Sequence, residues 1–556
     1  MTDGRPWVPV PLARGARGAV VAPHHLATTA GLEVLRQGGS AVDAAIATNA
    51  VLAVVAPHSC GLGGDAFWLI WDATEGRQTA LNGSGRSAAA VDVDALRSRG
   101  HDMVPFRGPH SITVPGAVRS WADAHRRHGR LTPETVLGPA IELARDGFPA
   151  TDVFSDAIES ILPVVLQLGD AGRGFLATYR AAGRAWRPGE RIRLPALAAT
   201  LETLARDGFD AFYDGALADR QAAALSGVGS PIRVDDLREH TSTWTDPISI
   251  GYRGVRVTTH PPNSSGIVAL ELLGILAQFD PPPAEAFTAN GTTDVRWIHL
   301  GIEAAKLAMA DRDAHLTDPE ARDVPVGMLL DAGYLAELAG RIDPTSAAQP
   351  PRSTNRRGGG TVYLATVDRD GNAVSLIESN YAGFGSGVVD TGTGIAYQNR
   401  GSWFSLDPAH PNVLAPRKRT LHTLLPGMLF RPGQTGPWVV VGAMGGDAQP
   451  QIHAQFVSAV VDGRQDVRTA ISAPRWFVEP PAHLAPPADV RLEPRHAPGV
   501  ADALAVLGHD LVPTGAFDHG LGHEHAIELV GGGPGVPGGS VAAATDPRSE
   551  GLPAVW

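Results

Sequence analysis

Residues 358–379, GGGTVYLATVDRDGNAVSLIES, predict a β-hairpin whose first strand starts with a hydroxyl side chain. Two apolar, β-branched runs flank Arg369-Asp370-Gly371, and a three-residue loop with glycine in the left-handed position is a favoured hairpin connection. If Asp370 is the centre of the loop, the numbers of cross-strand partners add up to 740. Thr361 then lies opposite Ser379, and because side chains alternate across a strand, the two hydroxyl groups share one face.

A hydroxyl residue directly after three glycines indicates a nucleophile released by self-cleavage. Gly360 has no Cβ, so the Gly360-Thr361 peptide can bend until the threonine hydroxyl attacks the carbonyl in front of it. The cut leaves Thr361 with a free α-amine, and the usual pKa of such an amine, ~7.7–8.0, suits a general base. Threonine with its own amine is a recognised nucleophile–base pair. The alternative is an ordinary hairpin after a glycine-rich loop, and the motif alone favours that alternative.

Composition predicts a soluble, globular chain that binds neither nucleic acid nor membranes. The 556 residues are 43% hydrophobic and 19% charged, with a formal net charge of −12, which argues against polyanionic partners. Cys60 is the only cysteine, so an internal disulfide and a cysteine-based metal site are excluded. The first 18 residues lack a signal-peptide apolar region, and the apolar run at 44–56 is too short to span a bilayer. We therefore expect a cytoplasmic location.

Caps and periodicity place several further elements along the chain. We expect helices at 26–36, after Ser40, at 133–145, 196–206, 213–225, 294–311 and 450–461, and strands at 66–71, 248–258 and 437–442. Residues 343–360 have almost no apolar side chain and form the best linker candidate. The 437–442 strand leads into Gly445-Gly446, whose backbone N–H groups could form an oxyanion hole. His519, His523 and His525 lack an accompanying acidic ligand set, so we predict a structural or surface role for them.

Several segments in order resemble the γ-glutamyltransferase family of N-terminal-nucleophile hydrolases over nearly the whole chain. The resemblance is carried by GLEVLRQGGSAVDAAIATNAVLAVVAPHSCGLGGDAF (31–67), SITVPGAV (111–118), PAIELARDGF (139–148), PPNSSG (261–266), HLGIEAAKLAMADRDAHLTDP (299–319), TVYLATVDRDGNAVS (361–375), FGSGVV (384–389) and GAMGGDAQPQ (442–451). It implies an α+β fold, a four-layer αββα sandwich. It also implies cleavage between Gly360 and Thr361 into a large segment, 1–360, and a small segment, 361–556, which together form one intertwined catalytic domain.

The resemblance also assigns candidate site residues. Thr361 corresponds to the family's nucleophile, and Ser379 to a second threonine that bonds it. Gly445 and Gly446 correspond to the oxyanion-hole glycines.

The residues that recognise the glutamyl group in this family are changed here. The family's carboxylate-binding arginine falls near Ser84, with Arg86 two positions on, and its paired serines become His422-Thr423. The aspartate that receives the α-amino group falls at or beside Trp403. A desolvated α-amino group needs a nearby anion, and none stands at the matching place.

The segment 398–426 is similar to a divergent branch that includes amidohydrolases of oxamate-type amides and enzymes that remove dicarboxylic acyl groups from β-lactams. In this branch the substrate has a carboxylate but no α-amino group, and that carboxylate could bind to side chains from several segments. The candidates are Arg400, His422, Thr423, Arg86 and Tyr381.

The sequence therefore predicts an autoprocessed amidohydrolase that cleaves the amide of a small acidic acyl group through an acyl-enzyme. No metal and no organic cofactor is required. The expected partners are a small-molecule amide substrate and the two fragments of the same chain, and a homodimer of that pair stays open. One alternative is a γ-glutamyl hydrolase or transferase acting on glutathione-like substrates. The other is a catalytically silent family member with a binding role.

Overall fold

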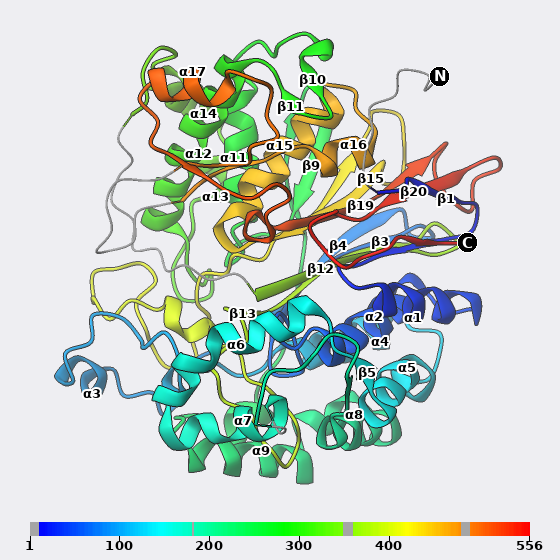
Figure 1. Cartoon of the computed structure of the whole chain (residues 1–556), viewed down its shortest axis with the longest axis vertical. Helices are drawn as coiled ribbons and strands as arrows, with labels where there is room; N and C mark the ends of the chain where they lie inside the picture. Colours follow the sequence, from blue (N-terminus) through cyan, green and yellow to red (C-terminus); the bar gives the residue numbers. More distant parts are fainter. Residues whose placement is uncertain (1–9, 181–182, 349–359, 480–489) are drawn as a thin grey trace.

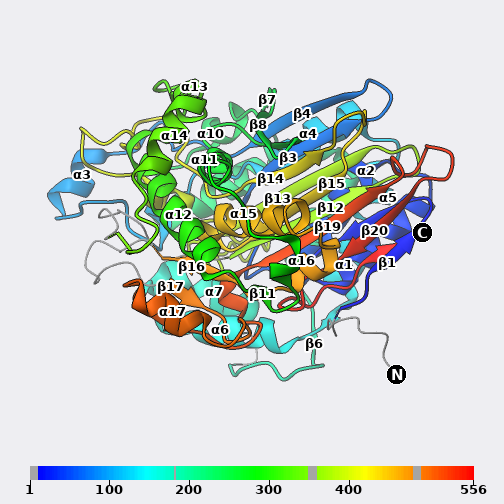
Figure 2. The same cartoon turned by 90° about the horizontal axis from the view of Figure 1, so that it is seen from above.

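The computed structural model describes residues 10–180, 183–348, 360–479 and 490–556. Two seven-stranded sheets, here sheets I and II, stack face to face, and helices cover the outer face of each (Figures 1 and 2). In spatial order, sheet I consists of β21 (Ala554–Val555), β2 (Ala19–Val21), β12 (Gly360–Val367), β13 (Ala373–Tyr381), β3 (Asp65–Asp72), β4 (Arg77–Gly83) and β7 (Thr243–Thr245). Sheet II consists of β1 (Ala13–Gly15), β20 (Ser540–Ala544), β19 (His523–Val530), β15 (Val439–Met444), β14 (Pro426–Phe430), β9 (Val255–Thr259) and β8 (Ile248–Tyr252).

One helical layer packs on sheet I and another on sheet II, as Figure 1 shows below and above the sheets. The first layer contains α1 (His25–Arg36), α2 (Ala41–Val55), α4 (Ala117–His128), α5 (Pro133–Asp146), α6 (Asp152–Gln167), α7 (Arg173–Tyr179), α8 (Pro195–Asp207) and α9 (Ala216–Gly227). The second contains α11 (Gly266–Leu276), α12 (Val295–His315), α14 (Ala332–Gly340), α15 (Gln449–Val461), α16 (Val467–Ser472) and α17 (Val500–Val506). The expected four-layer αββα arrangement is confirmed.

Shorter elements lie outside these layers. They are α3 (Val93–Ser98), α10 (Val234–Arg238), α13 (Val326–Leu329), β5 (Phe148–Pro149), β6 (Arg191–Ile192), β10 (Phe287–Thr288), β11 (Gly291–Thr292), β16 (Trp476–Val478), β17 (Val490–Leu492) and β18 (Leu511–Pro513). Among the described residues, no helix combines the length and the apolar character needed to cross a lipid bilayer.

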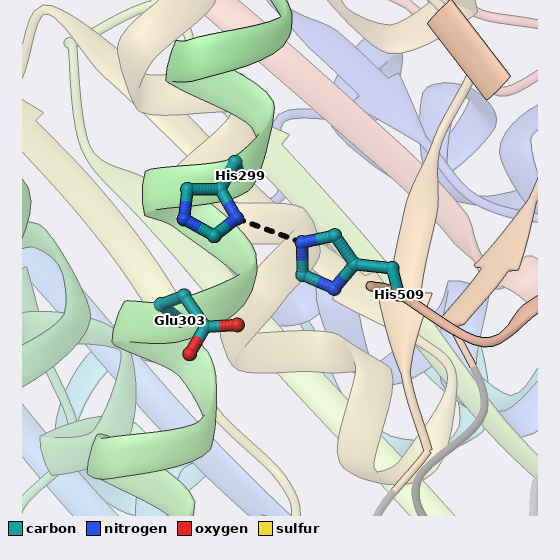
Figure 3. A group of neighbouring side chains, drawn as sticks. All are labelled: His299, Glu303 and His509. Atoms are coloured by element: carbon teal, nitrogen blue, oxygen red, sulfur yellow. Dashed lines mark hydrogen bonds between the residues drawn. The ribbon is translucent and has the colours of Figure 1, made fainter. Parts of the chain in front are cut away.

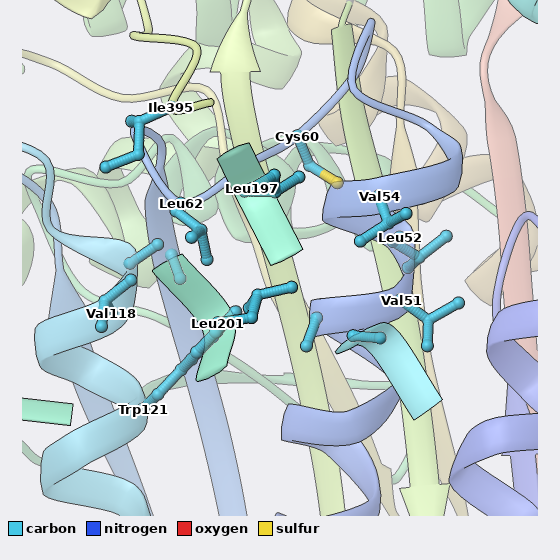
Figure 4. Close-up of a cluster of buried hydrophobic side chains, with 14 of the residues drawn as sticks. Val51, Leu52, Val54, Cys60, Leu62, Val118, Trp121, Leu197, Leu201 and Ile395 are labelled. Atoms are coloured by element: carbon cyan, nitrogen blue, oxygen red, sulfur yellow. The ribbon is translucent and has the colours of Figure 1, made fainter. Parts of the chain in front are cut away.

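Alternation along β12 builds two cores at once. Val362 and Leu364 belong to the core under the first helical layer, where α2 is buried on every side (Figure 4). Tyr363 and Ala365 point the other way, into the core between the two sheets. This is the two-residue period of a strand buried on both faces. Thr361 continues the face of Tyr363, so its side chain lies on the side of sheet II.

The predicted hairpin register is confirmed. Thr361 pairs with Ser379 and Val367 with Ala373. The N–H of Asp368 donates to the Asn372 carbonyl at 3.0 Å, which leaves a three-residue loop, and Gly371 has the expected left-handed φ of 85°. The strands are longer than predicted, because pairing continues back to Gly360, with a register shift between Gly360 and Thr361.

Most other predicted elements are confirmed, including the capping box of Ser40 and Asp43 at the start of α2. The single strand expected at 248–258 is wrong: it is a hairpin, β8 and β9, because Arg253 and Gly254 adopt positive φ and turn the chain. Most of the linker expected at 343–360 lies outside the described residues. Segments from before and after position 360 alternate within sheet I, where β12 and β13 lie between β2 and β3.

Candidate functional site

Three oxygen atoms line up at the start of β12. Thr361 Oγ1 lies 2.9 Å from Ser379 Oγ, which in turn lies 2.6 Å from the carbonyl oxygen of Gly360. Thr361 and Ser379 are 2% and 1% exposed. The candidate nucleophile is thus held, out of bulk water, beside the carbonyl of the peptide bond that the sequence predicts to be cut.

Donor and acceptor roles in this chain are fixed by elimination. The Gly360 carbonyl only accepts, so the Ser379 hydroxyl donates to it. The Tyr381 N–H donates to Ser379 Oγ at 2.7 Å, and the Thr361 hydroxyl therefore donates to Ser379 as well. Ser379 therefore polarises the Gly360 carbonyl, and the hydrogen of the Thr361 hydroxyl points toward Ser379 Oγ.

Gly445 and Gly446 follow β15 on the side of sheet II. Their φ angles are 145° and 58°, conformations that favour glycine. Neither backbone N–H donates to another described residue, which is unusual for the buried Gly446; Gly445 is partly exposed. Met444, the residue before them, lines the same pocket as Thr361. Two such donors in a turn can stabilise a developing oxyanion.

The pocket beside Thr361 also contains histidines that the sequence did not assign to a site. His24, His58, His519 and His523 line it, and burial lowers the pKa of both His24 and His58 to about 3. His523 Nε2 and His519 Nδ1 lie 2.8 Å apart. These imidazoles are neutral at pH 7, so they give the pocket hydrogen-bonding groups without charge.

Arg400 is a buried guanidinium, 1% exposed. Its Cζ lies 4.3 Å from the centre of the Tyr381 ring, and Nη1 donates to Thr423 Oγ1 at 3.3 Å. Nη2 has no hydrogen-bond partner within the part of the chain that the structure describes, although Asp65 and Asp447 favour the charged form of Arg400 through space. Burial lowers the pKa of Arg400 to about 10, so the group stays charged at pH 7. A buried cation of this kind calls for an anionic ligand.

His422 is held by an acidic residue that sequence reasoning missed. His422 Nε2 lies 3.2 Å from Asp65 Oδ2, and the Gly85 N–H donates to Asp65 Oδ1 at 2.8 Å. Burial lowers the pKa of His422 well below its usual value and raises that of Asp65 to about 7. With Nε2–H committed to Asp65, His422 presents Nδ1 as an acceptor, and this atom has no partner among the described residues. The Gly-Gly-Asp ending of the 57–65 turn was the available signal for Asp65.

Arg86 and Trp403 differ in their surroundings. The Arg86 guanidinium pairs with Glu320 at 2.7 Å and donates to the Thr241 carbonyl at 3.3 Å, so its charge is already balanced. Trp403 packs against the Tyr381 ring at 5.8 Å between centroids. The structure thus brings Arg400, Tyr381 and Thr423 together, whereas Arg86 is engaged elsewhere.

Comparisons with known proteins show the family of this chain. The family model for gamma-glutamyltranspeptidase matches residues 27–556. The oxamate amidohydrolase proenzyme of Klebsiella pneumoniae is 39% identical over 543 residues, covering 97% of this chain and 98% of that protein. The glutathione hydrolase-like YwrD proenzyme of Bacillus subtilis is 39% identical over 539 residues, with 97% and 98% covered. The crystal structure of cephalosporin acylase from Bacillus halodurans superposes with a TM-score of 0.89 at 37% identity, covering 100% of this chain and 99% of that one. The chain belongs to the gamma-glutamyltranspeptidase family and is a hydrolase of carbon–nitrogen bonds.

Proposed function

We propose that this protein is an autoprocessed amidohydrolase in which Thr361 is the nucleophile and the substrate's acyl group carries a carboxylate but no α-amino group. The observation that carries the proposal is the hydrogen-bonded chain from Thr361 through Ser379 to the Gly360 carbonyl. The proenzyme names of the two most similar relatives described above are consistent with it.

Maturation begins when Thr361 Oγ attacks the Gly360 carbonyl carbon. The C–N bond breaks, the hydroxyl proton passes to the leaving nitrogen, and an ester joins Gly360 to Thr361. Water then hydrolyses the ester, leaving a carboxylate on Gly360 and a free hydroxyl and amine on Thr361. The segments 1–360 and 361–556 stay together, because their strands alternate within sheet I.

Turnover repeats the same chemistry on a substrate amide. The α-amine of Thr361 takes the hydroxyl proton as Oγ attacks, and returns it to the leaving amine. The N–H groups of Gly445 and Gly446 stabilise the oxyanion. The resulting acyl-enzyme is hydrolysed by water, which releases the acid. Every proton is carried by the chain's own groups or by water.

Substrate choice follows from charge. Arg400 offers Nη2, next to the Thr423 hydroxyl, to a carboxylate. A substrate α-amino group would need an anion, and by its resemblance to the family this chain has Trp403 at or beside the position of that anion. The relative named oxamate amidohydrolase supports the same substrate class, because oxamate is an amide whose acyl part carries a carboxylate.

Two measurements on one protein preparation test this. N-terminal sequencing should find Thr361 at the start of the smaller fragment, and Thr361→Ala should give an uncut, inactive chain. The mature enzyme should hydrolyse oxamate-type or dicarboxylic monoamides at least tenfold more efficiently than a γ-glutamyl anilide. A preference for the anilide would refute the substrate assignment, and processing in Thr361→Ala would refute the nucleophile.

A further inference from the structure

A second cluster of chemically versatile side chains lies in the helical layer on sheet II. His299 and Glu303 are one turn apart on α12, so they share a face of the helix, and His509 joins them from the segment after α17 (Figure 3). They are 0%, 3% and 5% exposed. One nitrogen or oxygen atom from each lies within 4.8 Å of the others. None of the three lines the pocket beside Thr361.

The hydrogen bonds around the cluster fix where its lone pairs are. His299 Nε2 lies 2.8 Å from the Asp343 carbonyl oxygen, which only accepts, so Nε2 carries the hydrogen. His299 Nδ1 is therefore an acceptor, and His509 Nε2 donates to it at 2.8 Å. A backbone carbonyl that holds the remote nitrogen of an imidazole is the usual outer partner of a metal-binding histidine. His509 Nδ1 is left without a partner among the described residues.

We propose that His299 Nδ1, His509 Nε2 and the Glu303 carboxylate bind a divalent transition-metal ion of the zinc type, which replaces the shared proton of the histidine pair. His509 moves its proton from Nε2 to Nδ1, so both rings stay neutral and each offers a lone pair. Zn–N bonds of about 2.0–2.1 Å in a tetrahedral site put the two nitrogens about 3.3 Å apart. His299 Nδ1 and His509 Nε2 now lie 2.8 Å apart, and rotation of the two rings provides the larger separation. Two imidazoles and a carboxylate, with water in the fourth position, form a known zinc ligand set.

Glu303 can bind the ion without losing its present contacts. Lys306 Nζ donates to Oε1 at 2.7 Å, and the Ala348 N–H donates to Oε2 at 3.1 Å. Each carboxylate oxygen accepts two hydrogen bonds, so one lone pair on each stays available. When the site is empty, the Lys306 ammonium group balances the negative charge of Glu303. When the ion is bound, the same ammonium group repels it. The ion's role would be structural, since it ties α12 to the segment after α17 and, through His299, to Asp343.

The ion and its ligands can be tested on the full-length, processed protein with Zn²⁺ as the probe. Metal content is measured after growth with added zinc, and the affinity by competition with a chromophoric chelator. About one zinc per chain is expected, and His509→Asn and Glu303→Gln should each weaken binding about 10–100-fold. Lys306→Met should tighten binding about tenfold or more, because it removes a cation beside the site. At a zinc concentration of 100 times Kd, the unfolding equilibrium constant should fall about 100-fold.

The matched control is His519→Asn. His519 and His523 form another histidine pair at 2.8 Å, but no acidic side chain among the described residues completes a ligand set with them. This control should keep its zinc. Three results would each overturn the proposal. They are the absence of bound zinc in the unsubstituted protein, a zinc affinity in His509→Asn or Glu303→Gln as high as that of the unsubstituted protein, and loss of the ion in His519→Asn.

Discussion

Replacing Ser379 by alanine should slow maturation about 100- to 1000-fold, by an effect on the cleavage step that can be separated from the loss of folding stability. Ser379 Oγ donates to the Gly360 carbonyl at 2.6 Å and accepts from Thr361 and from the Tyr381 N–H. On the proposed mechanism the Gly360 oxygen becomes the oxyanion of the cleavage step. The alanine variant therefore loses the donor aimed at that oxygen.

The size of the effect follows from comparable sites. Loss of one hydrogen-bond donor to a developing oxyanion costs about 10²–10³ in rate, about 2.7–4 kcal/mol of transition-state stabilisation. The variant also removes the hydrogen bond that the Tyr381 N–H donates to Ser379 Oγ, and the loss of one hydrogen bond costs about 0.5–1.5 kcal/mol of folding stability. Ser379→Thr is the matched control, because it keeps the hydroxyl and adds a methyl group that suits a strand.

The assay follows the uncut chain on a denaturing gel after a pulse of cell-free synthesis, with mass spectrometry to confirm cleavage before Thr361. Ser379→Ala should be processed about 100- to 1000-fold more slowly, and Ser379→Thr within about tenfold of the unsubstituted rate. Ser379→Ala and Ser379→Thr are each also combined with Thr361→Ala, which prevents cleavage, and urea unfolding of these double variants measures their free energy of unfolding. This separates a slower cleavage step from a less stable fold. Processing of Ser379→Ala at the unsubstituted rate would refute the role assigned to this hydroxyl.

Three further predictions concern recognition, the oxyanion donors and pH. Arg400→Met should lower kcat/KM about 30-fold or more for a carboxylate-bearing amide, since truncating one partner of a buried charged contact costs about 2–5 kcal/mol. For the uncharged methyl ester of the same amide, the loss should be less than about tenfold. Equal losses for the two substrates would contradict carboxylate binding. Gly446→Ala should lower kcat about tenfold or more, because a Cβ strains the backbone at φ of 58° and shifts the N–H group that stabilises the oxyanion. An unchanged kcat would show that Gly446 does not belong to the oxyanion hole. Burial raises the pKa of Asp65 to about 7 and those of Glu378 and Glu524 to about 8. Because the folded state then holds protons that the unfolded state has released, these three acids should lower the free energy of unfolding as the pH rises. Buried histidines, whose pKa burial lowers, have the opposite effect below pH 6.5, so the fall should appear above pH 6.5 and continue to about pH 8, at about 1.4 kcal/mol per pH unit and ionising group. Urea unfolding of the Thr361→Ala precursor at about pH 6.5, 7 and 8 measures the fall, and a stability that rises over this range would contradict these assignments.

The hairpin could be predicted to the residue because local rules determine it. A glycine in the left-handed position, a three-residue loop and two β-branched runs allow one register, and that register places Thr361 opposite Ser379. The same reasoning explains the error at 248–258. There the turn consists of Arg253 and Gly254, and the two strands contain a glycine and an arginine of their own, Gly251 and Arg256, so the residue types alone do not mark the turn.

The surroundings of Arg400 and His422 could not be predicted in the same way. Asp65 and His422 are 357 positions apart in sequence, and only the packing of β3 against the 419–424 segment brings them together. Whether a guanidinium is balanced depends on burial and on neighbours from other segments. Arg86 and Arg400 look alike in sequence, yet one pairs with Glu320 and the other has a nitrogen without a partner among the described residues.

On the proposed function, charge balance in the site distinguishes this chain from a glutamyl-specific enzyme. A γ-glutamyl group brings one negative and one positive charge, and desolvating both requires a cation and an anion in the protein. This chain has a buried cation in Arg400, and on the proposed function the indole of Trp403 lies at or beside the position where the anion is expected. Asp447, the acidic residue that follows the glycine pair, is occupied by Arg312 at 2.5 Å. Introducing a carboxylate as Trp403→Asp should therefore improve binding of γ-glutamyl substrates and weaken that of simple dicarboxylic amides, because the new anion also partly neutralises Arg400. If the two KM values moved together, electrostatic balance would not be what selects the substrate.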